Sequence, residues 1–122
     1  MYPINNIQGI YKQESELEGN HVIILLLVKP SDTGADDYIK KFNYLHYRSK
    51  RYCSIYLLGY SQDFQGKYID AISVQGIDHQ KWQYSDQCFS DACDELQNRL
   101  SNWHYSGEPE MIILQNSSNS DS

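Results

Sequence analysis

The run Val22-Ile-Ile-Leu-Leu-Leu-Val28 decides the fold class of this chain. Every position is apolar, whereas a half-exposed strand or helix would interleave polar residues at its own period. Gly19-Asn20 precedes the run and is a turn signal, and Pro30 follows it and cannot donate to a strand ladder. We therefore expect residues 22–28 to form a central strand that is buried on both faces, as in an α/β protein.

The segment after this strand is predicted to be an amphipathic helix. Thr33 is a suitable N-cap, and Tyr38, Phe42 and Leu45 follow a spacing of four and three residues, which places them on one apolar stripe. The helix is expected to run to about Arg48, with its acids in the first turn and its cations near the end, as the helix dipole favours.

The rest of the chain supplies a second helix and three further strands. Ser85 is a good N-cap, and apolar residues from Phe89 to Trp103 recur at helical spacing. Aromatic and β-branched residues predict strands at 52–60, 68–77 and 111–114. Gly59 marks a bulge in the first of these strands or its end. The second is expected to run antiparallel to the first, because the connection between them is short. Residues 78–84 are expected to be a connecting loop.

The resulting order, β-α-β-β-α-β, predicts a ferredoxin-like α/β (α+β) domain with two helices and a single, mainly antiparallel four-stranded sheet. The alternative is a small three-layer α/β sandwich with helices on both faces. Residues 1–20 are expected to form a lead-in that packs Ile4, Ile7 and Ile10 on the core. Residues 1–116 are taken as one domain, and residues 117–122 as a disordered tail or the start of a linker.

Charge and composition narrow the class of partner. The chain has 122 residues, with 16 acidic and 10 basic side chains and a net charge of -6. This charge makes nucleic acid an unfavourable partner and suits a basic protein. The longest apolar run is far shorter than a membrane span, and no leader pattern is visible. The odd number of cysteines argues against a disulfide framework, so a cytoplasmic protein is expected.

No metal or cofactor is expected, because the four histidines lie far apart in the sequence and no nucleotide-binding motif is present. Cys53 and His46 could form a catalytic pair, but core packing of the cysteine is the favoured interpretation. Asp32, which directly follows the first predicted strand and its proline, is the one acid there that helix capping leaves unexplained. It supports an alternative in which the protein is a metal-dependent nuclease-like enzyme.

Two groups of residues are predicted to bind a partner. Tyrosine and arginine dominate interface hot spots, and the 11 tyrosines of the chain include a cluster mixed with basic residues. The first predicted binding group is Tyr44, Tyr47, Arg48 and Tyr52. The second is the acidic outer face of the last helix, with Asp91, Asp94 and Glu95.

These observations favour a non-enzymatic protein-interaction domain. In its shortness, acidity and lack of catalytic motifs, the chain is similar in format to immunity proteins that neutralise a basic toxin and to adaptor domains of bacterial defence systems. The further alternative is a sensor or assembly domain of a larger protein. An uncovered apolar sheet face would also permit a homodimer.

Overall fold

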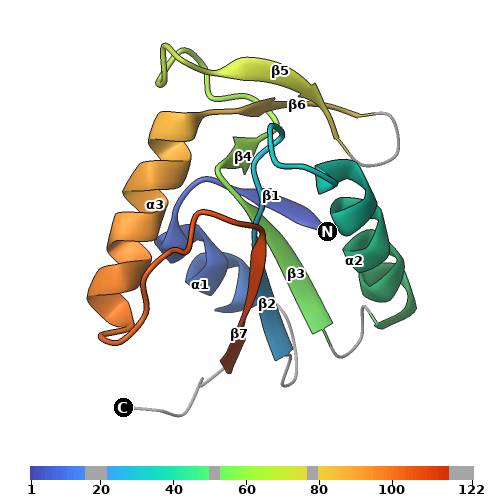
Figure 1. Cartoon of the computed structure of the whole chain (residues 1–122), viewed down its shortest axis with the longest axis vertical. Coiled ribbons are helices and arrows are strands. Elements are labelled where there is room, and N and C mark those ends of the chain that lie inside the picture. Colours follow the sequence, from blue (N-terminus) through green and yellow to red (C-terminus); the bar gives the residue numbers. More distant parts are fainter. Residues whose placement is uncertain (16–21, 50–52, 77–79, 116–122) are drawn as a thin grey trace.

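The computed structural model describes residues 1–15, 22–49, 53–76 and 80–115, which form three helices and two β-sheets (Figure 1). Sheet A has the strand order β1-β3-β2-β7, and sheet B has the order β4-β6-β5. In chain order the elements are β1 (Tyr2–Ile4), α1 (Ile7–Ser15), β2 (Val22–Leu27), α2 (Ala35–Ser49), β3 (Cys53–Leu58), β4 (Tyr60–Ser61), β5 (Ile72–Gln75), β6 (Lys81–Tyr84), α3 (Asp86–Arg99) and β7 (Glu110–Gln115).

Sheet A is mixed rather than antiparallel. Strands β1 and β2 both run parallel to β3, while β7 runs antiparallel to β2. Helix α2 lies between the parallel neighbours β2 and β3 in the chain, as a crossover connection requires, whereas α1 lies between β1 and β2, which β3 separates in the sheet. The prediction of a central strand in the Val22 run is confirmed, because β2 lies between β3 and β7 and its residues from Ile23 to Leu27 are buried.

The expectation of a single, mainly antiparallel four-stranded sheet is wrong, and the ferredoxin-like order is not found. The predicted strand at 68–77 shrinks to Ile72–Gln75 and pairs with β6, which occupies part of the expected loop 78–84. The physical reason is that β1 and β2 already flank β3 on both sides. The next strand therefore has no free edge of β3 to join, and residues 60–84 build a second sheet.

Gly59 separates the two sheets. Its φ of +89° is one that a side chain would strain, and a Cβ there would lie 2.9 Å from Cβ of Phe89. Its N–H donates to the carbonyl of Ile4 (3.0 Å), and its own carbonyl accepts from the N–H of Ser85 (3.2 Å). The prediction that Gly59 marks the end of a strand is confirmed, since β3 ends at Leu58.

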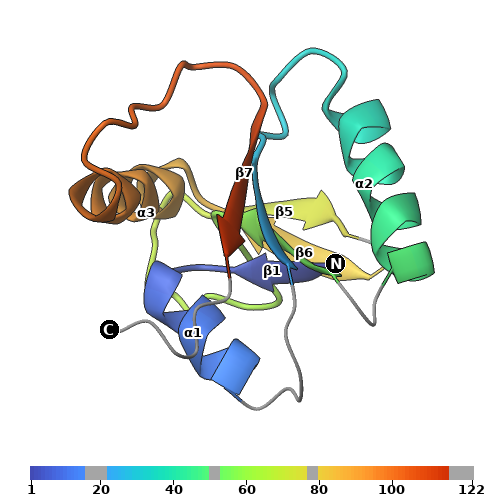
Figure 2. The same ribbon diagram turned by 90° about the horizontal axis from the view of Figure 1, so that it is seen from below.

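Helices cover both faces of sheet A. Figure 2 shows α1 and α3 on one side of the sheet and α2 on the other. This arrangement of helices on both faces of a sheet is the one that the alternative prediction, a small three-layer α/β sandwich, requires. The lead-in packs as expected, because Ile4, Ile7 and Ile10 are all buried, and it also supplies β1 and α1.

The cap predicted for the last helix is confirmed. The Ser85 hydroxyl accepts from the N–H of Cys88 (3.0 Å) and donates to Asp70 Oδ1 (2.6 Å). The other oxygen of Asp70 accepts from the N–H of Gln87 (2.9 Å). Two side chains thus satisfy the first turn of α3, and the loop before β5 is fastened to that turn. The tail predicted at 117–122 lies outside the described residues.

Candidate functional site

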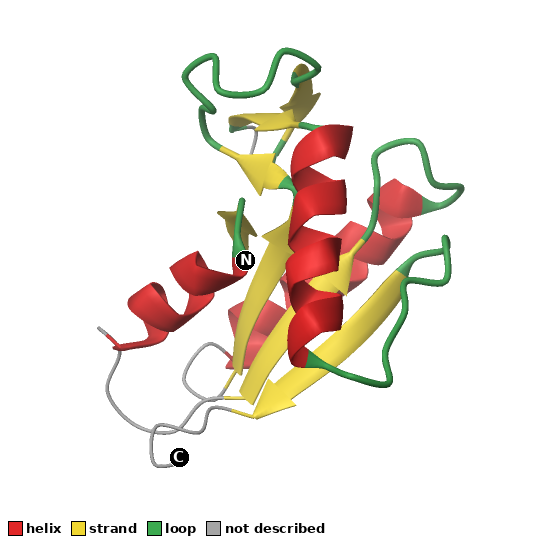
Figure 3. Ribbon diagram, turned by 90° about the vertical axis from the view of Figure 1, so that its left-hand side faces the viewer, coloured by secondary structure: helices red, strands yellow, loops and turns green. Residues whose placement is uncertain are grey.

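Strand β7 forms one edge of sheet A. It pairs with β2 along its whole length, from Val22 opposite Gln115 to Leu27 opposite Glu110. No other described strand pairs with its outer side, and Figure 3 shows it as the outermost strand of the sheet. Alternate N–H and C=O groups of β7 therefore point away from the sheet, where a further strand could accept and donate hydrogen bonds.

The side chains of β7 alternate between two environments. Ile112 and Leu114 are half-buried and pack against the core, whereas Met111 is 42% and Ile113 60% exposed. Met111 and Ile113 stand opposite Leu26 and Ile24, so they share the sheet face of the even-numbered residues of β2.

Helix α2 covers only part of this face. It contacts β3, whereas the side chains toward β7 stay open, including Val22 (46% exposed). Leu45, 40% exposed, lies two turns after Tyr38 and on the same side of the helix. Tyr38 packs against the core, and burial, followed by the carboxylate of Glu110, raises its pKa.

The two edges of sheet A differ in their protection. Strand β1, at the opposite edge, contains Pro3, which has no N–H to offer and discourages a further strand. Between Met111 and Leu114 there is neither proline nor lysine, the residues that commonly blunt an edge. Apart from the charge of Glu110 at its start, β7 therefore carries neither of these two protective residue types.

Unsatisfied polar atoms lie at the start of β7. Glu110 Oε2 accepts from the hydroxyl of Ser106 (3.3 Å), but its buried Oε1 has no hydrogen-bond partner among the described residues. The buried hydroxyl of Tyr105 likewise has none within that part of the chain. Burial, followed by the carboxylate of Asp32, raises the pKa of Tyr105 to about 12, so this hydroxyl stays protonated.

No described lysine or arginine forms an ion pair with this acid. The Lys29 ammonium lies 5.3 Å from the ring centroid of Phe89 and 5.8 Å from that of Tyr105, but it forms no ion pair within the described residues. The chain after Arg99 contains no lysine or arginine, while it contains Glu108, Glu110 and Asp121. The start of β7 thus carries a negative charge that no described cation neutralises through an ion pair, and this charge favours a cationic group nearby.

The first group of predicted binding residues lies on the outer side of α2. Tyr44 and Tyr47 are among the most exposed aromatic side chains described. Arg48 donates to the hydroxyl of Tyr44 (2.9 Å), and its guanidinium lies 5.7 Å from the ring centroid of that tyrosine. The fourth member, Tyr52, lies outside the described residues. The three described residues form a small polar and aromatic surface on the same helix as Leu45.

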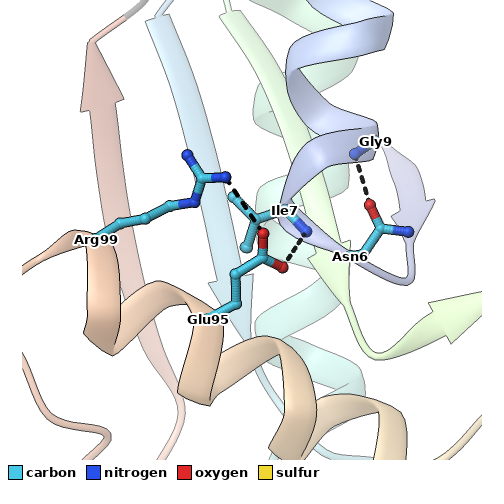
Figure 4. A network of polar contacts seen from close by, with 5 residues as sticks. All are labelled: Asn6, Ile7, Gly9, Glu95 and Arg99. Atoms are coloured by element: carbon cyan, nitrogen blue, oxygen red, sulfur yellow. Dashed lines mark hydrogen bonds and ion pairs between the residues drawn. The ribbon is translucent and has the colours of Figure 1, made fainter.

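The second group lies across the sheet, on α3, and part of it has internal contacts. Glu95 Oε1 accepts from the N–H of Ile7 (3.2 Å), and its other oxygen forms an ion pair with Arg99 (3.4 Å; Figure 4). Together with Asn6, whose side chain accepts from the N–H of Gly9 (2.7 Å), Glu95 caps α1. Asp91 and Asp94 are exposed. The two predicted groups therefore lie on opposite faces of sheet A.

The residues considered for catalysis are accounted for by local structure. Asp32 Oδ2 accepts from the N–H of Lys29 (2.9 Å) and so closes the loop after β2. Among the described residues, no three histidine, cysteine or acidic side chains are grouped so that they could hold a metal ion. Cys53 is buried, and burial, assisted by Glu14, raises the pKa of its thiol, which disfavours the thiolate that a nucleophile needs.

Comparison of the chain with models of protein families, with curated proteins and with solved structures gives no match. None of the described helices combines the length and the apolar character that crossing a bilayer requires. Residue-level geometry is therefore the basis for a functional proposal. Sequence reasoning placed Met111 and Ile113 in a short strand but did not predict that this strand lies at the edge of the sheet.

Proposed function

We propose that this protein is a protein-interaction domain that binds a basic partner through strand addition at β7. The observation that carries the proposal is an edge strand whose outer side pairs with no described strand, which has outward apolar side chains and has no lysine or proline between Met111 and Leu114. A partner segment in extended form would pair with β7, and its alternate side chains would cover Met111 and Ile113.

Charge indicates the chemistry of that segment. The net charge of -6 attracts a basic partner and repels a second copy of the chain. A lysine or arginine beside the start of β7 would be attracted by the negative charge of Glu110, whose buried Oε1 has no hydrogen-bond partner among the described residues. A partner that extended from β7 across α2 would also contact Tyr44, Tyr47 and Arg48, at the margin of the interface.

The test is a selection of short peptides from a random library on the intact protein. Enriched peptides are expected to alternate β-branched with basic residues, to protect β7 amides from hydrogen exchange, and to bind less tightly as salt is raised. Ile113→Lys should abolish binding, because a lysine blunts the edge. Ile69→Lys is the matched control, since Ile69 is a fully exposed isoleucine in the loop before β5.

Peptides that bind Ile113→Lys as tightly as the wild type would overturn the proposal. Sedimentation over a range of protein concentrations separates a homodimer from a heterologous complex. A dimer that Ile113→Lys dissociates and Ile69→Lys does not would make a second copy the occupant of the same edge, against the charge argument.

A further inference from the structure

A second feature, whose described lining contains no residue of β7, is a cavity of about 270 Å³ between sheet A, sheet B and the start of α2. It lies beyond the carboxyl end of β3, and Figure 1 shows sheet B above that end with the first turn of α2 beside it. Proteins with parallel strands commonly bind ligands at this position, because the crossover connections leave a crevice there.

The walls of the cavity contain both apolar and polar residues, and its two aromatic rings are held in place. Ile39 and Leu57 form one side, and the rings of Tyr60 and Trp82, with centroids 6.4 Å apart, form another. The Tyr60 hydroxyl donates to the carbonyl of Val28 (3.1 Å), which fixes that ring. The Trp82 ring is held against the backbone of Gly76, where an added Cβ would lie 2.5 Å from the indole. The aromatic surfaces are therefore in place before a ligand arrives.

The charged group among the described lining residues is Asp36. Its side chain has no hydrogen bond or ion pair within the part of the chain that the structure describes. No lysine or arginine is among the described lining residues. The carboxylates of Asp32 and Asp36 are also close enough to raise the pKa of Tyr60, after the larger effect of its burial. The cavity thus combines an aromatic corner with negative potential.

We infer that this cavity binds a small organic monocation, an ammonium group on a compact aromatic or aliphatic body. Aromatic ring faces attract an ammonium group, and the exposed carboxylate of Asp36 at the edge of the cavity can form an ion pair with it. An anion would meet the field of two carboxylates with no described cation in the lining. The volume suits a body the size of one ring rather than a nucleotide or cofactor.

The test uses phenethylamine hydrochloride and its neutral counterpart, 2-phenylethanol, on the intact protein. Binding is followed through the indole N–H resonance of Trp82, with Trp103, which does not line the cavity, as the reference signal. Phenethylamine should bind saturably, with a dissociation constant on the order of 1 mM, which is typical for so small a ligand. The alcohol should bind about tenfold more weakly.

Asp36→Asn should weaken binding of the amine about tenfold and leave binding of the alcohol unchanged. Asp37→Asn is the matched control, because Asp37 lies in the same first turn of α2, interacts with the same helix dipole and does not line the cavity. Ile113→Lys should bind the amine like the wild type, so this result is independent of the edge-strand proposal.

Three results would each overturn the inference. The first is an amine that fails to saturate the Trp82 shift of the wild type. The second is an alcohol that binds as tightly as the amine, which needs no variant to measure. The third is Asp37→Asn weakening the amine as much as Asp36→Asn, which would reduce the effect to the general charge of the helix terminus.

Discussion

Replacing Ser85 by alanine should destabilise the protein by about 2 kcal/mol. The hydroxyl of this fully buried residue accepts from the N–H of Cys88 at 3.0 Å and donates to Asp70 at 2.6 Å, and alanine removes both bonds. Loss of an N-cap costs about 0.5–2 kcal/mol. The upper end applies here, because Cys88 is itself fully buried and water cannot replace the lost acceptor.

The corresponding shift in melting temperature follows from the chain length. The unfolding entropy for 122 residues is about 0.26 kcal/mol/K, so 2 kcal/mol lowers the melting temperature by about 8 °C. Urea and thermal unfolding, followed by circular dichroism, measure both quantities. The control is Ser101→Ala, an exposed serine just beyond α3. A loss for Ser85→Ala that is no larger than the loss for Ser101→Ala would refute the capping argument.

Three further predictions concern ionisable groups. The hydrogen bonds from Ser85 and from the N–H of Gln87 lower the pKa of Asp70. The stabilisation that they give is therefore complete above the pKa of the unfolded state and is lost as the pH falls through the pKa of the folded state. The difference in stability between the wild type and Asp70→Asn should vanish in acid, as urea midpoints measured against pH would show. Burial raises the pKa of Cys88 to about 11 and that of Cys93 to about 12, and Cys53 is buried as well. Mass spectrometry should therefore find all three thiols resistant to iodoacetamide at neutral pH until urea unfolds the chain. Rapid labelling of the native protein would contradict this prediction. Glu95→Ala should lower the free energy of unfolding by about 1 kcal/mol and speed hydrogen exchange in α1, because it removes the acceptor for the N–H of Ile7. Asp94→Ala, on the same helix, should change neither quantity. Equal exchange rates in the two variants would show that Glu95 does not hold α1.

The elements that were predicted correctly are those whose signal lies within a few neighbouring residues of the sequence. The Val22 run has no polar face to expose, so its burial could be read from composition alone. Ser85 caps α3 through an atom three residues away, which is also a local relation. The isoleucines of the lead-in were correctly placed in the core, although three-residue β1 was too short to show a period.

What failed was the choice of strand partners. The strand expected at 68–77 was paired with its predecessor because the connection is short, but β1, from the far end of the sequence, occupies that position. Residues Lys81–Tyr84 alternate too briefly to be distinguished from a loop. The same limit hid the candidate site: the apolar run from Met111 to Leu114 indicates a strand, yet only the assembled sheet makes that strand an edge.

The order of strands in sheet A has a consequence for synthesis of the chain on the ribosome. β1 pairs with β3, and β2 pairs with β3 and β7, so both early strands emerge before any of their neighbours has been made. The most apolar segment of the protein, residues 22–28, therefore remains exposed to solvent until residues 53–58 have also left the exit tunnel. Nascent chains halted before that point should be prone to aggregate and should depend on chaperones, and slower translation would prolong their exposure.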